Sequence, residues 1–459
     1  MQVSAPSALP AGCGSATGSV ADAYTANSAV QPQLAADPAA GTLLYGVWEQ
    51  DRWNAIGARA IAFSHSADGG ASWGAIAALP FSACGGGAGA SYDRASDPSI
   101  TVGPGGVVYA SALAFSAANY LASGGVSAVL VSRSTDGGTT WTSPYPAKVD
   151  TGAATGPWYF NDRDAIAADP ASAHVYLVWD RLTSNSGGAS IPTWMLHSAD
   201  GGLNWDPARV VYDPGPNVPF TQTFNNQPQV LPDGSVVILF TLFDNFGTHL
   251  AAVRSTDHGT TWPASGAATV VAPMQPFGTQ NPIAGGLPIR DSSLMAQTAV
   301  DPVYGTLAAV WQESSFSNGV RDGIALTLSS DKGAHWSTPV QVNTATSVAA
   351  FDPAVHFGSG GRIAVTYYDF RDYVAGSAVL STSLWLVQSS DGGASWTETR
   401  LYGPFDLNKA PPADLQAGTT GNALFLGDQQ GLAWNGSAWV GLDAATVSSG
   451  SRIFAARVP

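Results

Sequence analysis

One octet of the form S-x-D-x-G-x-x-W recurs six times in the 459-residue chain and constrains its fold more than any other feature. The copies are SADGGASW from Ser66, STDGGTTW from Ser134, SADGGLNW from Ser198, STDHGTTW from Ser255, SSDKGAHW from Ser329 and SSDGGASW from Ser389. Their aspartates lie 57 to 74 residues apart, which is enough chain for four short strands and their turns. In such an octet Asp accepts backbone N–H bonds, Gly adopts positive φ and Trp folds back between sheets. We therefore predict that each octet is a scaffold hairpin turn without a ligand role.

A second turn mark precedes each octet, and a seventh mark, WNGS at Trp434, has no octet after it. The six others are DPAAG at Asp37, GPGG at Gly103, DPASA at Asp169, PDG at Pro232, DPVYG at Asp301 and GSGG at Gly358. Seven first turns and six second turns count seven units of four antiparallel strands, which predicts an all-β, seven-bladed β-propeller. Six blades are the alternative. We expect one propeller domain over 31–459 and an N-terminal arm, 1–30, whose stretch from Val20 to Val30 closes the last blade.

The charge balance limits the partners of the chain. Thirty-three acidic residues face 18 basic ones, giving a net charge of −15, which argues against binding nucleic acid or an anionic membrane. Hydrophobic residues make up 45% of the chain, yet no apolar run approaches the ~20 residues of a membrane-spanning helix. The composition predicts neither a disordered nor a membrane-spanning protein.

The two cysteines, Cys13 and Cys84, lack the spacing of a metal site. They are equally compatible with a disulfide between the arm and the first repeat and with free thiols. The first 30 residues hold no apolar signal-peptide segment, and Met1 precedes a Ser/Ala/Pro-rich stretch typical of a mature exported chain. We expect a secreted or periplasmic protein.

The octet resembles the Asp-box, or BNR repeat, of the sialidase superfamily, and the six copies cover nearly the whole chain. The resemblance implies a β-propeller. It leaves the activity open, because such propellers include sialidases, other exo-glycosidases, polysaccharide lyases, xyloglucanases and non-catalytic receptors. The early Arg-Ile-Pro motif of sialidases is missing here, and Leu287-Pro288-Ile289-Arg290 does not replace it.

The end of the propeller opposite the octets carries longer, irregular loops and is the expected position of a site. Aligning the first strands of the units puts seven residues at the mouth of the central channel: Gln31, Asp97, Arg163, Gln227, Met295, Asp352 and Gln429. Seven arginines fall in the loops of this end: Arg52, Arg94, Arg163, Arg181, Arg290, Arg321 and Arg371. A guanidinium fork grips a carboxylate with two hydrogen bonds, so an acidic sugar is the expected ligand.

The predicted substrate-binding residues are therefore Arg52, Arg94, Arg163, Arg181, Arg371, Asp97, Asp352 and Gln227. Each arginine also has an aspartate close in sequence. Structural ion pairs lining a water-filled channel are accordingly the alternative.

Catalytic residues are predicted from the ends of the second strands, where VWEQ, VWDR, VWQE and TYYD align Glu49, Asp180, Gln312 and Tyr368. Sialidases use a Tyr nucleophile activated by Glu, together with an Asp acid/base. By that resemblance Tyr368, Glu313 and Asp162 take the three roles.

The leading hypothesis is a sialidase-like exo-glycoside hydrolase acting, as a monomer, on an acidic oligo- or polysaccharide. A polysaccharide lyase acting on a uronate-containing glycan and a non-catalytic glycan- or protein-binding propeller are the alternatives. No cofactor is expected. The Asp-rich loops could hold structural calcium, although they lack EF-hand spacing.

Overall fold

The computed structural model describes residues 1–14, 23–86, 91–116, 125–152, 158–185, 188–214, 221–414 and 423–459. Within these ranges the chain is built from β-strands, and its helical segments are short 3₁₀ turns. These turns are η2 (Pro104–Gly106), η3 (Ser315–Ser317), η4 (Ser359–Gly361) and η5 (Leu407–Lys409). The predicted all-β class is confirmed.

The strands form antiparallel sheets in which consecutive strands are neighbours. The first two groups of four are β1 (Ala29–Ala36), β2 (Leu44–Arg52), β3 (Ala58–Ser66) and β4 (Ala77–Ala78), then β5 (Arg94–Gly103), β6 (Val107–Phe115), β7 (Val126–Ser134) and β8 (Tyr145–Thr151). A single residue pair, Ala58 with Ala95, links them into one eight-stranded sheet.

The following sheets repeat the same order. The next comprises β9 (Trp158–Ala168), β10 (Val175–Asn185), β12 (Thr193–Ser198) and β13 (Arg209–Tyr212), with β11 (Gly188–Ser190) beside β10. Then come β14 (Gln222–Val230), β15 (Val236–Asp244), β16 (Gly247–Ser255) and β17 (Thr269–Pro273), followed by β18 (Gln297–Val300), β19 (Leu307–Glu313), β20 (Gly323–Ser329) and β21 (Val340–Gln341). The last sheets are β22 (Ala350–Phe357), β23 (Ile363–Asp369), β24 (Ser381–Ser389) and β25 (Thr397–Asp406), the pair β26 (Pro412–Ala413) and β27 (Ala423–Leu424), and β28 (Gly431–Trp434), β29 (Trp439–Thr446) and β30 (Ser451–Val458).

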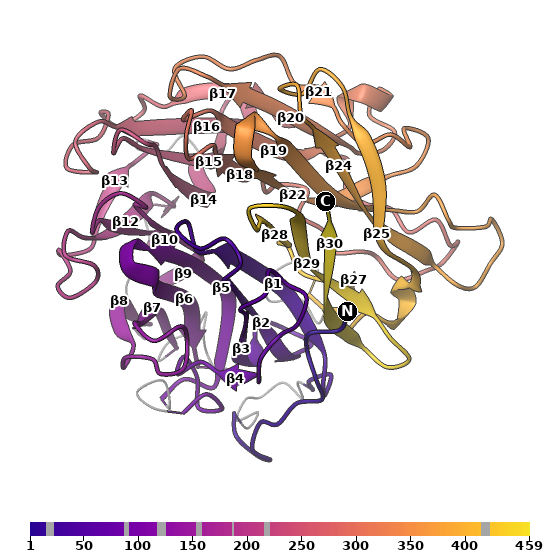
Figure 1. Cartoon of the computed structure of the whole chain (residues 1–459), viewed down its shortest axis with the longest axis horizontal. Helices are drawn as coiled ribbons and strands as arrows, with labels where there is room; N and C mark the ends of the chain where they lie inside the picture. The colour runs from indigo at the N-terminus through magenta and orange to yellow at the C-terminus, as the bar shows by residue number, and fades with distance from the viewer. Residues whose placement is uncertain are drawn as a thin grey trace.

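The sheets surround a common centre (Figure 1). The first strand of each unit contacts the first strand of the next, in the order β1, β5, β9, β14, β18, β22 and β28, and β28 contacts β1 again. These strands therefore form a closed ring.

The hydrophobic core lies between neighbouring sheets, where alternating side chains of the second strands are buried on both faces. Trp48, Trp179 and Trp311 occupy the same position in three second strands and are fully buried. Each indole N–H is satisfied, for example by Glu313 Oε2 at 3.1 Å from Trp311 Nε1. Replacing one of these tryptophans by Ala would cost about 3–5 kcal/mol, because it removes packing from two sheets at once.

The ends of the chain close the ring together. The backbone N–H of Val3 donates to Ile453 O at 2.8 Å, and that of Ala455 donates to Met1 O at 2.8 Å. The first residues therefore pair with the edge of β30. Sequence analysis assigns this strand to the stretch ending at Val30, but Val30 belongs to β1 and pairs with Glu49, while residues 15–22 lie outside the described part.

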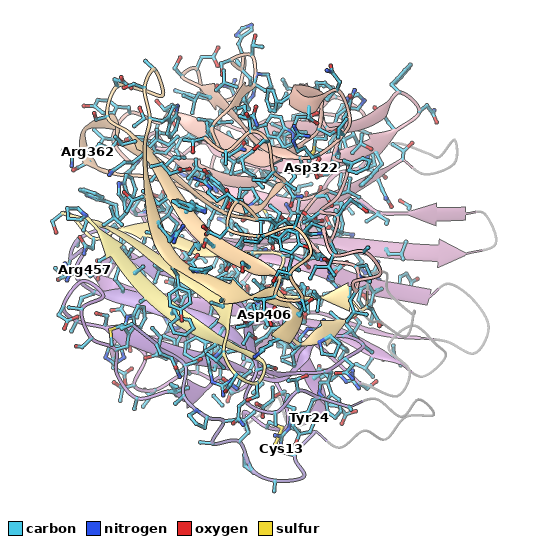
Figure 2. All side chains as sticks on the ribbon, turned by 90° about the vertical axis from the view of Figure 1, so that its right-hand side faces the viewer. Cys13, Tyr24, Asp322, Arg362, Asp406 and Arg457 are labelled. Atoms are coloured by element: carbon cyan, nitrogen blue, oxygen red, sulfur yellow. A yellow bond between two sulfur atoms is a disulfide. The ribbon has the colours of Figure 1, made fainter. Side chains whose placement is uncertain are left out.

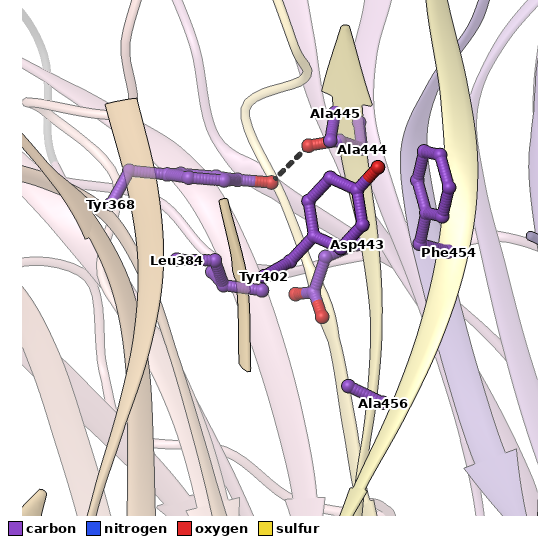
Figure 3. A pocket seen from close by; sticks show the side chains of 8 residues that line it. All are labelled: Tyr368, Leu384, Tyr402, Asp443, Ala444, Ala445, Phe454 and Ala456. Atoms are coloured by element: carbon purple, nitrogen blue, oxygen red, sulfur yellow. Dashed lines mark hydrogen bonds between the residues drawn. The ribbon is translucent and has the colours of Figure 1, made fainter. Parts of the chain in front are cut away.

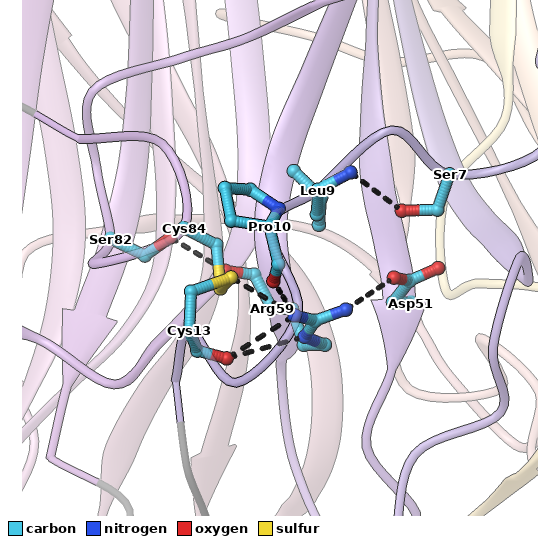
Figure 4. The surroundings of a disulfide bond; sticks show 8 residues. All are labelled: Ser7, Leu9, Pro10, Cys13, Asp51, Arg59, Ser82 and Cys84. Carbon is cyan, nitrogen blue, oxygen red and sulfur yellow. Dashed lines mark hydrogen bonds and ion pairs between the residues drawn. A yellow bond between two sulfur atoms is a disulfide. The ribbon is translucent and has the colours of Figure 1, made fainter.

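A disulfide joins Cys13 to Cys84 and ties the arm to the first sheet (Figures 2 and 4). The guanidinium of Arg59 lies beneath it, donating to Pro10 O at 2.6 Å and to Asp51 Oδ2 at 3.0 Å. The arm thus spans from the last sheet to the first. Of the two states compatible with the sequence, the structure contains the bridged one.

The six octets form the same turn at the end of each third strand. In the second octet Ser134 Oγ donates to Asp136 Oδ1 at 2.7 Å, and Gly138 N donates to Ser134 Oγ at 2.8 Å. Asp136 Oδ1 also accepts from Thr140 N at 2.9 Å. The other five octets repeat all three bonds. Their polar groups are used within the turn, as expected of scaffold.

At the opposite end, five of the first strands contain a β-bulge. Its first residue has positive φ in every case: Gln31 (55°), Asp97 (50°), Arg163 (53°), Asn225 (56°) and Asp352 (49°). Four of these were aligned in the sequence at the channel mouth. In β14 the bulge lies between Phe224 and Gln227, so Asn225 and not the predicted Gln227 has the positive φ. The left-handed conformation costs these residues about 1 kcal/mol or more and needs support from neighbours.

Candidate functional site

A cavity of about 350 Å³ lies at the bulge end of the ring. It is lined by Gln31, Arg52, Ala55, Ile56, Ser96, Asp97, Phe160, Asp162, Arg163, Phe224, Arg290, Asp291, Ser293, Leu294, Met295, Asp414 and Asp428. The lining comes from four first strands, from the loops that precede two others, and from the end of β2 with the loop that follows it. Bulges turn side chains away from their own sheet, and this explains why residues of separate sheets meet here.

The aligned ends of the second strands support the bulges from the preceding sheet. Glu49 Oε1 accepts from Asp97 N at 3.3 Å, Asp180 Oδ2 accepts from Asn225 N at 2.7 Å, and Gln312 Oε1 accepts from Asp352 N at 3.2 Å. Each bond joins one sheet to the next and satisfies the N–H of a residue with positive φ. The position that sequence analysis associated with catalysis is thus an architectural one in these three sheets.

Tyr368 stands at the equivalent position of β23 and also reaches the following sheet. Its hydroxyl donates to Ala444 O at 2.6 Å and contacts Gln430 Oε1 at 3.1 Å, and its ring stacks on Phe351. Burial raises the pKa of Tyr368 well above its ordinary value. The side chain, for which the sequence predicts a catalytic role, is fully buried beside a small internal cavity that Asp443 also lines (Figure 3).

Glu313, the predicted activator of that tyrosine, does not line the 350 Å³ cavity either. It is 4% exposed and accepts from Gln275 N at 3.1 Å and Ser315 N at 2.9 Å, in addition to the indole of Trp311. Its carboxylate therefore fastens two loops to the end of β19.

Asp162 is the predicted catalytic residue that lines the cavity. It precedes the bulge of β9 and is half-buried, and its Oδ1 accepts from Arg163 N at 3.1 Å. In the preceding sheet, the apolar residue Leu113 occupies the position that Glu49 and Asp180 occupy in their own sheets. Asp162 therefore supports the bulge of β9 itself. Burial raises the pKa of Asp162 to about 6, with Arg163 opposing and Asp97 reinforcing the shift.

Two arginines of the cavity share one carboxylate. Asp428 Oδ2 accepts from Arg163 Nη2 at 2.6 Å and from Arg290 Nη2 at 2.8 Å. Burial alone would raise the pKa of Asp428, but the two guanidinium groups lower it to about 2. Arg163 Nη1 also lies 3.6 Å from Asp97 Oδ1, while Gln31 donates its side-chain amide to the same oxygen. We call Arg163, Asp428 and Arg290 the arginine–aspartate triplet; its three charges sum to +1.

Arg52 completes the cationic side of the cavity. Its Nε lies 3.1 Å from Glu49 Oε2, and its Nη1 donates to Trp53 O at 2.8 Å. The guanidinium groups of Arg52 and Arg290 lie 5.2 and 4.7 Å from the centroid of the Phe425 ring. Arg52 is thus held by one carboxylate and one aromatic ring, and only 2% of it is exposed.

The remaining predicted binding residues do not line this cavity. Arg94 donates to Ile56 O, Arg181 forms two bonds to Asp150, Arg371 bridges Asp369 and Glu398, Asp352 accepts from Ser292 N, and Gln227 contacts Asn225. The three arginines follow the alternative interpretation, in which nearby polar groups of the protein use their donors. Of the eight predictions, Arg52, Arg163 and Asp97 are brought together.

Asp428 and Asp414 were not predicted from the sequence, and Arg290 was predicted only as one of the loop arginines. Asp428 precedes Gln429, which the alignment did place at the channel mouth. It follows Gly427, whose φ is 123° and where a Cβ atom would lie 2.4 Å from the Gln31 backbone. The glycine directly before Asp428 was the sequence signal that could have indicated this close approach of two strands.

The described part of the chain contains no cluster of three or more His, Cys, Asp or Glu side chains arranged to hold a metal ion. Structural calcium thus stays a prediction without a candidate site there. Across the same residues, no helix has the length and apolar character needed to cross a membrane.

No protein-family model matches the sequence, and no curated protein matches it. Similar solved structures include the Hadza microbial sialidase Hz136, with 18% identity, a TM-score of 0.47, and coverage of 74% of this chain and 63% of the sialidase. An α-L-arabinanase from Penicillium chrysogenum has 13% identity and a TM-score of 0.48, with 95% of this chain and 94% of the other covered. An ulvan lyase of family PL25 has 10% identity and a TM-score of 0.44, with 78% and 79% covered. The chain spans less than two thirds of the sialidase, and similarities at this level assign no activity.

Proposed function

We propose that the chain is a secreted or periplasmic, sialidase-like propeller with seven blades, belonging to the Asp-box group and acting as a monomer. The closed ring of seven first strands supports the blade count. The identical Ser–Asp–Gly bonds of the six octet turns support the Asp-box assignment. The Cys13–Cys84 disulfide supports export, because disulfides persist in oxidising compartments.

Its function, in this proposal, is hydrolysis of a glycosidic bond in the cavity at the bulge end, with Asp162 as general acid. One observation carries the assignment: a half-buried carboxyl with a pKa of about 6 lines the same cavity as a buried arginine–aspartate triplet. A carboxyl with this pKa keeps its proton in mildly acidic solution and can give it to the leaving-group oxygen. Asp97 is the second carboxylate, because it lines the same cavity and lies beside Arg163 and Gln31.

The triplet supports an acidic sugar as substrate. Asp428 pairs with both guanidinium groups and Asp97 lies 3.6 Å from Arg163, so Arg290 shares its one carboxylate with Arg163. Arg290 is the more accessible of the two, with 21% of its side chain exposed. A sugar carboxylate would meet Arg290 while Asp162 faces the scissile bond.

A polysaccharide lyase would use a tyrosine or histidine to remove the C5 proton. No tyrosine or histidine is among the described residues that line the cavity, which favours hydrolysis.

The test is turnover of sialosides, uronate-containing oligosaccharides and their neutral analogues by the full chain and by Asp162→Asn. We expect the variant to lose about 10²–10⁴-fold in kcat, the usual contribution of a general acid. Asp233→Asn is the control, because Asp233 pairs with Lys332 outside the cavity. Product absorbing near 235 nm would indicate the lyase instead, and glycan binding without turnover would indicate the binding propeller.

The charge of the sugar is tested separately with Arg290→Gln. We expect KM for the acidic substrate to rise about tenfold, the equivalent of ~1.4 kcal/mol, while KM for the neutral analogue changes little. Arg371→Gln is the matched control, because Arg371 is held by Asp369 and Glu398 away from the cavity. Equal effects of Arg290→Gln on both substrates would contradict an acidic ligand.

A further inference from the structure

Three histidines from two neighbouring sheets stack at the octet end of the molecule. His174 precedes β10, His197 lies on β12, and His258 occupies the octet turn after β16. The ring of His174 lies 4.5 Å from that of His258 and 5.1 Å from that of His197, with interplanar angles of 10° and 14°. Tyr176 extends the stack at 5.1 Å from His197.

A chain of hydrogen bonds fixes the protonation of the stack. Asp206 Oδ2 lies 2.8 Å from His197 Nδ1, and His197 Nε2 lies 2.8 Å from His174 Nδ1. The carboxylate accepts from Nδ1–H of His197, so Nε2 of neutral His197 must accept from Nδ1–H of His174. One added proton can be accommodated on His197 if His174 changes tautomer. A second proton would set two N–H groups against each other at 2.8 Å.

The position of His258 is unusual for the octets. Four of the six carry glycine there, namely Gly69, Gly137, Gly201 and Gly392, and every residue at this position has positive φ. His258 has a φ of 55° and Lys332, the remaining exception, has 63°. Both reach the sheet before their own: Lys332 Nζ pairs with Asp233, and His258 stacks on His174. A side chain at this position thus links neighbouring sheets.

We propose that the His174–His197–His258 stack is an acid-sensitive lock, which holds the sheet of β9–β13 to the sheet of β14–β17 when neutral and loosens this seam when protonated. The device is independent of the glycan chemistry at the other end of the molecule. It would give an exported protein a structural response to acidification.

The charged groups around the stack compensate its protonation only in part. Asp206 has 66% of its side chain exposed, so solvent screens it. Asp169 is buried but uses its oxygens on Ala171 N and on the Ser172 hydroxyl. Asp257 is committed to its own octet turn.

Arg209 is the cation that faces the seam. From β13 it donates to Gly259 O and Thr260 O of the same octet turn. A guanidinium stays charged in neutral and in acidic solution alike, so Arg209 bridges the two sheets in both. Acid should therefore loosen the seam without separating it.

The direction of the pH effect follows from the neutral state of His174. Burial, followed by the charges of His197 and His258, lowers the pKa of His174. The folded seam therefore binds fewer protons than the unfolded chain, and its stability falls as the pH drops through about 6.5. Asp162, whose pKa is raised to about 6, changes global stability in the opposite sense over part of this range. A local measurement is thus required.

The test is amide hydrogen exchange of the full chain at pH 7.5 and 5.0, with rates corrected for the intrinsic effect of pH. We expect protection of residues 255–262 to fall about tenfold at pH 5.0, and that of residues 389–396 to change less than twofold. The second segment is the matched control, because this octet carries Gly392 at the position of His258 and contains no histidine.

Two variants decide the cause. His174→Gln keeps a donor toward His197 but cannot be protonated, and His258→Gly restores the residue that four octets carry. Both should abolish the tenfold acid response. An acid response that persists in His174→Gln, or none in the unmodified chain, would overturn the proposal. Loss of the response in His258→Gly alone would likewise refute a role for the His174–His197 pair.

Discussion

The two ends of the ring use the same repeat in opposite ways. At the octet end, six turns form identical bonds between a serine, an aspartate and a glycine within five residues. At the bulge end, five of the first strands share a backbone distortion, but four residue types, Gln, Asp, Arg and Asn, occupy that position. The repeated side chains of the octets form hydrogen bonds within their own turn. The side chains at the bulges vary, and they contact residues of other sheets across the axis of the ring. In this molecule sequence repetition marks the scaffold, and variation on a repeated backbone marks the candidate site.

The strongest test of this comparison removes one carboxylate from each end and measures turnover. Asp162→Asn should abolish most turnover, whereas Asp136→Asn in an octet should leave kcat within about twofold, because that carboxylate bonds only within its own turn. The pH dependence sharpens the test. Activity of the unmodified chain should fall as the pH rises above about 6, since Asp162 then loses its proton. Loss of activity in both variants would contradict the division between the ends.

Removing a buried charge and an exposed charge from the bulge end should affect stability unequally. Arg163→Ala should lower the free energy of unfolding by about 3–5 kcal/mol, because it leaves Asp97 buried without its ion pair and removes one of the two guanidinium groups that pair with Asp428. Urea unfolding at pH 7 measures this effect. The control is Arg321→Ala, whose arginine makes an exposed bond to Thr346 O and should cost less than about 0.5 kcal/mol.

A smaller loss is expected at the octet end. Ser134→Ala removes the acceptor of Gly138 N and the donor to Asp136, so the free energy of unfolding should fall by about 1–2 kcal/mol. The exposed neighbour Thr139 provides a control, because Thr139→Ala removes one exposed bond to Asp136 O. A loss from Ser134→Ala as large as that from Arg163→Ala would mean that the octet turns carry as much of the fold as the bulge end does.

The smallest effect is a dependence on acid. Hydrogen bonds from Thr140 and Ser134 lower the pKa of Asp136 to about 2. Its contribution is therefore complete above the ordinary value near 3.9 and disappears as the pH falls through 2. Asp136→Asn should shift the urea midpoint slightly at pH 7 and by less at pH 2, where about half of the Asp136 carboxyls of the folded chain stay ionised. A shift as large at pH 2 as at pH 7 would contradict the ionised state as the origin of the stabilisation.

The sequence predicted the all-β class because turn chemistry is local and repeats. It also aligned Glu49, Asp180 and Tyr368 correctly, because each of the three pairs with the residue that precedes a bulge. The direction in which these three side chains point was not predictable from the sequence. An alternating pattern indicates which residues share a face, but whether that face meets a cavity or a neighbouring sheet depends on how the sheets pack. Tyr368, which the sequence predicts as a catalytic residue, lies in the core.

What the sequence alone determined are the interactions that span two to four residues, such as the bonds of each octet turn. The tertiary structure decided everything that joins distant residues. Gln31 meets Asp97 across 66 residues, and Arg163 meets Asp428 across 265. The physical reason is that closing the ring brings the first strands together at one axis. Only then do these side chains, each unremarkable in its own segment, share a single cavity.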